Sequence, residues 1–115
     1  MTTIWELTKA ALNGLGVPLA ADVYIPASGV DFPDLYLVYF LVTSPREQSA
    51  DDAETLRSYI TQVSTYSRTG LVGLPDVAGA MIAAGFQRSA MRRLPYSFQT
   101  RHFGLAEDFV YLEEA

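Results

Sequence analysis

Two runs of strand-forming residues flank a polar, acidic segment in the middle of the chain. The runs cover residues 35–42 and 56–66, and both are rich in aromatic and β-branched side chains. Such side chains pack well on a pleated, buried surface, so each run predicts a β-strand. The segment between them, residues 43–55, holds four carboxylates and no large apolar side chain. We therefore predict a long hairpin that ends in a protruding, charged loop over residues 43–53.

Two further segments carry helix signals. Thr3 and Glu6 have the spacing of a capping box, and an apolar stripe at helical spacing follows, which predicts a helix over residues 3–14. Pro75 suits the first position of a second helix. Gly85 suits the end of this helix, with Met81 and Phe86 in apolar contact around it.

The remaining segments read as short strands and turns. We expect strands over residues 20–25, 86–94 and 101–112, with a loop over residues 26–33 and a turn over residues 95–99. The strand over residues 35–42 is apolar on both faces, which places it in the middle of a sheet or against a partner. Because the strands cluster between helices, the order predicts one α+β domain over residues 1–115. Its mainly antiparallel β-sheet would carry two helices packed on one face.

Composition limits the function classes. A chain of 115 residues that is 50% hydrophobic can bury a core without a metal or disulfide. Cysteine is absent, which excludes disulfides and thiolate metal sites and makes an intracellular protein the default. The net charge of −5 opposes sequence-independent attraction to a nucleic acid backbone. We expect no membrane span, because no apolar run approaches the roughly 18 residues that a span needs. We expect no signal peptide either, because no basic region precedes an apolar one at the N-terminus.

Candidate catalytic and metal-binding patterns are weak throughout. His102 is the only histidine, which leaves any metal site short of ligands, and a strand position for it indicates a surface or half-buried side chain. The sequence lacks the nucleophile signature GxSxG and the glycine patterns of phosphate-binding loops. It also lacks the alternating carboxylate spacing of a calcium-binding loop. We therefore expect no catalytic site, no metal and no cofactor, and we do not expect an enzyme.

Charges of opposite sign gather in two separate regions. The hairpin segment carries Arg46, Glu47, Asp51, Asp52 and Glu54, and a basic region later in the chain carries Arg88, Arg92, Arg93 and Arg101. One interpretation of both regions is ordinary surface charge. The sharper interpretation is that the basic region of one copy meets the acidic segment of the next, since head-to-tail contacts generate rings when the rotation closes.

Six tyrosines fall in or near the expected strands, and two interpretations of them stay open. They either form part of the strand core with their hydroxyls at its edge, or line a surface on which nucleic acid bases stack. The tyrosines are Tyr24, Tyr36, Tyr39, Tyr59, Tyr66 and Tyr96.

The order of aromatic, glycine and proline positions along nearly the whole chain resembles a known family. The matching positions are Trp5, Gly16-Val17-Pro18, Pro33-x-x-Tyr36-x-x-Tyr39, Tyr59-x-x-Gln62-Val63-x-x-Tyr66-Ser67, Gly85-Phe86 and Thr100-x-His102 with Asp108-Phe109. In this order the chain resembles the small tail-completion proteins of long-tailed bacteriophages, which are the tail terminators and tail-to-head joining proteins. The stretch Gln99-Thr100-Arg101-His102 departs from the family's usual lead into the last strand.

The resemblance implies a structural role in the virion. Such subunits form a hexameric ring at the neck, and some wait as monomers in the host cytoplasm before assembly. The ring caps the tail tube, joins it to the head connector or stopper protein, and lets DNA pass without sequence-specific binding. The acidic segment would then line the channel or contact the tube. The alternative from another class is a small, non-catalytic bacterial α+β protein-binding module.

Overall fold

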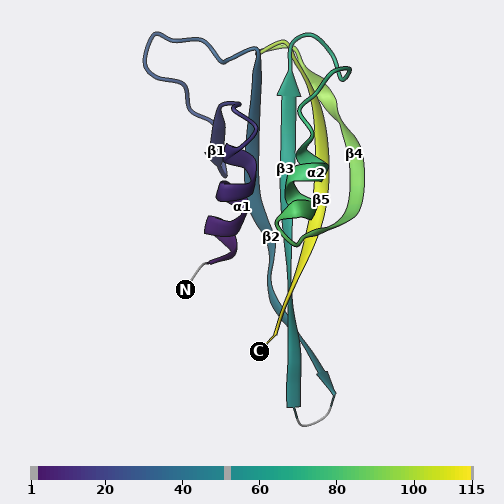
Figure 1. The fold of residues 1–115 in the computed structure, drawn as a ribbon. Helices are drawn as coiled ribbons and strands as arrows, with labels where there is room; N and C mark the ends of the chain where they lie inside the picture. Colours follow the sequence, from purple (N-terminus) through teal and green to yellow (C-terminus); the bar gives the residue numbers. More distant parts are fainter. Residues whose placement is uncertain (1–2, 51–52, 115) are drawn as a thin grey trace.

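The chain folds into a five-stranded sheet that carries two helices (Figure 1). The computed structural model describes the backbone of residues 3–50 and 53–114 and the side chains of residues 3–41 and 59–112. The elements in chain order are α1 (Ile4–Asn13), β1 (Leu19–Ala21), β2 (Leu35–Ala50), β3 (Ala53–Ser67), α2 (Val77–Ala83), β4 (Gln87–Ser97) and β5 (His102–Glu114).

The strands lie in the order β1-β2-β3-β5-β4, so β1 and β4 form the two edges of the sheet. Only the short β1–β2 pair is parallel, and the other three pairs are antiparallel. The predicted α+β class with a mainly antiparallel sheet is therefore confirmed. The apolar segment of β2 lies inside the sheet, because β1 pairs with Leu37–Tyr39 on one side and β3 pairs on the other.

The core forms between the helices and one face of the sheet. Leu12 of α1 and Met81 of α2 belong to the same buried cluster as residues of β2, β3 and β5. The register places these strand residues on one face, which we call the helix side; they are Leu37, Tyr39, Val63 and Phe109. We call the opposite face, which carries Tyr36, Val38, Gln62, Ser64, Tyr66, Ala106 and Asp108, the helix-free face.

Local hydrogen bonds define the helix ends. The predicted capping box is present, since the Thr3 hydroxyl accepts from Glu6 N–H and the Glu6 carboxylate accepts from Thr3 N–H. The prediction that Pro75 begins α2 is wrong. Asp76 follows it and caps the helix, because its carboxylate accepts from Gly79 N–H at 3.0 Å. Gly85 ends this helix as predicted, with a φ of 102° that a residue with a side chain rarely adopts.

The predicted loop over residues 43–53 is wrong for the part that the structure describes, because β2 continues to Ala50 and β3 begins at Ala53. The register runs out to the pair Ala50 and Ala53, with three irregularities on the way. Backbone groups make the ladder, so polar side chains do not end a strand whose partner stays in place. The β2–β3 extension projects beyond the helices and gives the molecule extents of 54 × 26 × 23 Å (Figure 1).

Two other predicted boundaries also differ. β1 ends at Ala21 rather than at residue 25, because Asp22 takes a positive φ of 66° that breaks the extended backbone. β4 continues through Pro95 to Ser97 where a turn was expected. Proline is tolerated there because β4 is an edge strand, and a missing N–H can face solvent.

Candidate interaction surface

Three of the charged hairpin residues, Arg46, Glu47 and Glu54, lie on the extension of β2 and β3. Arg46 and Glu47 pair along the backbone with Ser58 and Arg57, and Ser49 pairs with Glu54. Asp51 and Asp52 lie outside the described residues, as do the side chains of the other three predicted charged residues. The contact between this segment and a neighbour, the tube or DNA therefore stays a prediction.

The basic region is brought to one edge of the sheet. Arg88, Arg92 and Arg93 lie on β4, and Arg101 lies with a φ of 61° in the turn that leads to β5. Arg88 Nη1 lies 3.5 Å from Glu107 Oε2, and Arg92 Nη1 lies 3.4 Å from Asp108 Oδ2. Two of the four predicted arginines are thus paired within their own subunit. Among the described side chains, Arg93 has no hydrogen-bonding or ionic partner.

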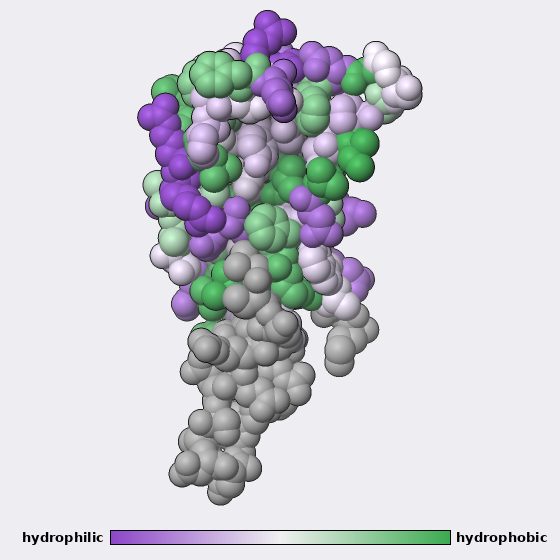
Figure 2. Space-filling view, turned by 180° about the vertical axis from the view of Figure 1, so that it is seen from behind, coloured by the Kyte–Doolittle hydropathy of each residue, from purple (hydrophilic) through white to green (hydrophobic). Residues whose placement is uncertain are grey.

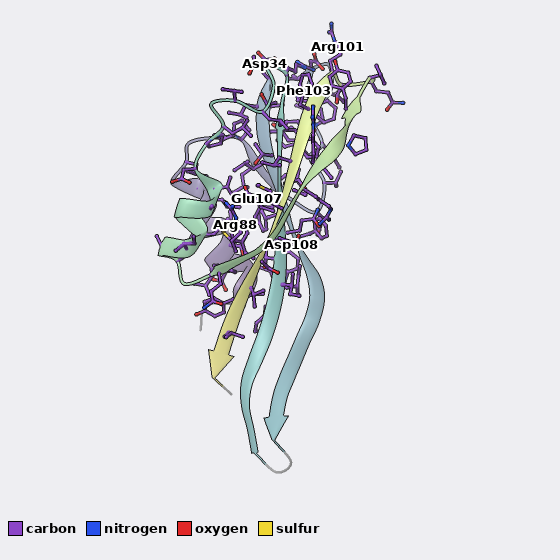
Figure 3. The ribbon with its side chains drawn as sticks, turned by 90° about the vertical axis from the view of Figure 1, so that its right-hand side faces the viewer. Asp34, Arg88, Arg101, Phe103, Glu107 and Asp108 are labelled. Atoms are coloured by element: carbon purple, nitrogen blue, oxygen red, sulfur yellow. The ribbon has the colours of Figure 1, made fainter. Side chains whose placement is uncertain are left out.

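Glu107 is a buried carboxylate beneath α2. Its side chain is only 8% exposed and lies on the helix side beside Arg88, as Figure 3 shows. Burial raises its pKa, because a charged carboxylate loses hydration there, and the Arg88 guanidinium opposes this effect only in part. The Arg88–Glu107 pair therefore neutralises a buried charge within the subunit. Arg88 is correspondingly less available to bind a partner.

The helix-free face carries an aromatic cluster at the end away from the hairpin. Tyr36 is its centre, with ring centroids 4.8 Å from Tyr24, 4.9 Å from Tyr66 and 5.6 Å from Phe32. Burial raises the pKa of Tyr36 to about 12, so its hydroxyl stays neutral at all ordinary pH values. The Tyr36–Tyr66 rings are stacked and the other two pairs are tilted, and aromatic pairs of this kind gain about 0.5–1.5 kcal/mol beyond burial.

His102 joins this cluster from β5 and is buried, in contrast to the surface or half-buried side chain that was expected. The ring is 1% exposed and stands edge-on to Tyr36, with centroids 5.0 Å apart. His102 Nε2 lies 2.8 Å from the Pro33 carbonyl oxygen, so this nitrogen must donate. Nδ1 has no partner among the described residues. The bond from Nε2 therefore links the loop before β2 to the sheet. Among the described residues, no hydroxyl is hydrogen-bonded to this imidazole as a nucleophile would be.

A small hollow opens next to the aromatic cluster and the β1 edge. Its volume is about 240 Å³, and it is lined by Asp22, Val23, Tyr24, Phe32, Tyr36, Val38 and Tyr66. Asp22 is exposed and its carboxylate has no partner among the described side chains. The hollow therefore combines aromatic walls with one unpaired negative charge. The sequence indicated three of these tyrosines, but Asp22 and Phe32 carry no signal, because only the folded loop brings them to β2.

A polar group occupies the middle of the same face. Arg92 Nη2 donates to Gln62 Oε1 at 2.7 Å, and the same guanidinium pairs with Asp108. Asp108 Oδ1 is buried and has no partner among the described residues. Figure 2 shows this face with apolar and polar side chains interspersed rather than in one apolar patch. Of the two interpretations of the tyrosines, Tyr36 and Tyr39 agree with strand core, as both are buried.

Within the described residues, no group of histidine, cysteine, aspartate and glutamate side chains has a geometry that suits a metal ion. None of the helices that the structure describes is long and apolar enough to cross a membrane. Comparison of the sequence with protein-family models and with curated proteins gave no match. The arrangement suits contacts with other polypeptides, through the two sheet edges, the hairpin extension and the aromatic hollow.

Proposed function

We propose that the chain is a structural subunit of a bacteriophage neck, of the tail-terminator or tail-to-head joining kind, and that it acts without catalysis. The observation that carries the proposal is the β2–β3 extension, which is paired along its backbone and projects past the helices. Extended pairing of this length costs conformational entropy, which burial against another surface can offset. A second polypeptide that covers it would supply that burial.

The two edges of the sheet support the same function. β1 and β4 each lack a neighbour on one side in the single chain, and exposed edges are templates for contacts between chains. The sequence resemblance adds the kind of assembly, which is a ring around passing DNA. The net charge of −5 suits a channel along which DNA slides, because carboxylates repel phosphates.

The deciding experiment removes the gene from the phage genome that encodes the chain. We expect filled heads and complete tails that stay unjoined, and purified protein should restore joining when it is added to the lysate. A second protein, with residues 44–59 replaced by an Asn-Gly turn, keeps every residue of the core cluster and should fold without restoring joining. Circular dichroism checks that this shortened protein is folded.

Joined, infectious particles in the absence of the gene would overturn the proposal. A coding region without head and tail genes around it would overturn it as well. The alternative, a small protein-binding module unrelated to virions, would then take its place.

A further inference from the structure

We propose that the aromatic hollow beside β1 receives Arg93 and Met91 from the β4 edge of a second copy of this chain. The proposal rests on the proposed function in one respect, namely that copies assemble. It adds which surfaces meet, and it assigns the hollow the ligand class of a guanidinium side chain.

The chemistry of the hollow selects a cation. Four aromatic rings form its walls, and Asp22 is the one charged residue among the described residues that line it. Aromatic faces attract a guanidinium, and the carboxylate repels phosphate and other anions. The volume of about 240 Å³ is below the roughly 300–1,000 Å³ of pockets for small molecules and cofactors. One or two side chains are therefore a better match than a free ligand.

The β4 edge presents the complementary pair. Arg93 is exposed and, unlike Arg88 and Arg92, has no ion pair with the described residues. Met91 lies two residues earlier on the same face of the strand and is 53% exposed. A thioether also contacts aromatic rings favourably. An arginine and an exposed methionine without partners among the described residues thus stand together at the β4 edge. The aromatic hollow, which carries an unpaired carboxylate, is lined by the segment after β1 and by residues of β2 and β3.

The faces on which the two surfaces lie define the geometry of the contact. Met91 and Arg93 pair with Glu107 and Leu105, which places them on the helix side. The hollow lies on the helix-free face, where Tyr36 and Val38 point. The helix side of the β4 edge of one copy must therefore lie against the helix-free face of its neighbour, near β1. The sheets of the two copies then overlap at this contact.

This arrangement repeats from copy to copy. The hollow lies over β2, which is three strand spacings or roughly 14 Å from β4, and the two surfaces lie on opposite faces, so two copies cannot satisfy both contacts with each other. Each copy instead uses its arginine on one neighbour and its hollow on the other. Such a head-to-tail contact closes into a ring when the rotation per subunit divides a full turn.

Two single substitutions test the contact, each with a matched control. Arg93→Glu removes the donor, and Lys9→Glu makes the same charge change on the exposed surface of α1. Val23→Arg places a cation at the hollow. Its control, Ile25→Arg, places a cation in the same loop but outside the lining of the hollow. All four positions are exposed, so the fold should survive. Light scattering after size-exclusion chromatography should show assemblies for the wild type and both controls, and monomers for Arg93→Glu and Val23→Arg. Association should weaken at least about tenfold in the two test variants.

Mixing the two test variants checks the head-to-tail direction. The Arg93→Glu chain keeps an intact hollow and the Val23→Arg chain keeps an intact arginine. One contact can form between them and no third copy can join, so the mixture should give heterodimers and nothing larger. A mixture that stays monomeric would overturn the proposal.

Two further results would also overturn the contact while leaving the neck function standing. One is an Arg93→Glu protein that assembles as well as the wild type. The other is a wild-type chain that stays monomeric at every concentration, since a neck subunit that waits for its partner protein would still pass the gene-removal experiment. Failure of the proposed function itself would appear as joined particles in that experiment, whatever the contact does.

Discussion

The guanidinium of Arg68, at the end of β3, lies 3.1 Å from the carboxylate of Asp31, which belongs to the loop before β2. Arg68 also donates to the Thr100 and Phe32 carbonyl oxygens and pairs with Asp34. One side chain thus connects three segments at the end of the sheet away from the hairpin. Figure 3 shows Asp34, Arg101 and Phe103 together at this end. A hydrogen bond from the Phe32 amide and the pairing with Arg68 lower the pKa of Asp31.

Replacing Arg68 should destabilise the fold. Arg68→Met removes all these donors at once. Arg68→Lys should cause a smaller loss of stability than Arg68→Met, because an ammonium group keeps the charge but cannot reproduce the planar, forked donors of a guanidinium. The measurement is the midpoint of urea unfolding, with Lys9→Met as a control that removes an exposed cation. A wild-type midpoint for Arg68→Met would show that the loop is held by other contacts.

The ring of His102 should contribute more by packing than by its hydrogen bond. His102→Phe keeps an aromatic ring beside Tyr36 and loses the bond to Pro33, so we expect a loss of about 1–2 kcal/mol in the free energy of unfolding. His102→Ala also leaves a cavity and should cost about 3 kcal/mol or more. Equal losses in the two variants, measured by urea unfolding, would assign the effect to the hydrogen bond instead.

Gly85 should not tolerate a side chain. Its φ of 102° is unfavourable for other residues, and an added Cβ would lie 3.3 Å from the ring of Tyr111. Gly85→Ala should therefore lower the free energy of unfolding by roughly 2–3 kcal/mol. Gly16 also has a positive φ but open space around it, so Gly16→Ala is the matched control, with an expected loss of roughly 1 kcal/mol. Thermal unfolding of both variants separates backbone strain from the steric contact.

Glu107 should make stability depend on pH. Its pKa is raised in the folded state, so folding favours the protonated carboxyl group. The stability that this group contributes is complete below its ordinary value of 4.5 and is lost as the pH rises through the higher value of the folded protein.

A neutral side chain at position 107 removes this dependence. We therefore expect Glu107→Gln to become more stable relative to the wild type as the pH rises from 4.5 toward neutrality. Urea unfolding of both proteins at a series of pH values measures the difference. A difference that moves in the opposite direction would mean that the Arg88 pair outweighs the burial.

Local patterns in the sequence predicted the elements well where a local rule decides them. The capping box at Thr3 and the glycine end of α2 need only neighbouring residues, and both were predicted correctly.

Other features depended on partners distant in the chain. The polar residues of the hairpin were predicted as a loop, yet the backbone ladder carries them as strands. The basic region was recognised as a group, but only the pairing of β4 with β5 shows that Arg88 and Arg92 are neutralised within the subunit while Arg93 is not. The hollow was not predicted at all, because Asp22 and Phe32 reach Tyr36 through a loop whose path no periodicity records.

The sequence by itself determined the α+β class, the start of α1 and the end of α2, since these follow from hydrophobic period and from short-range hydrogen bonds. The tertiary structure decided which charges are paired, which aromatic rings meet and which edges stay open. These outcomes depend on strand order and register. The backbone makes the same hydrogen bonds in any register, so a local sequence pattern does not reveal which side chains become neighbours across the strands.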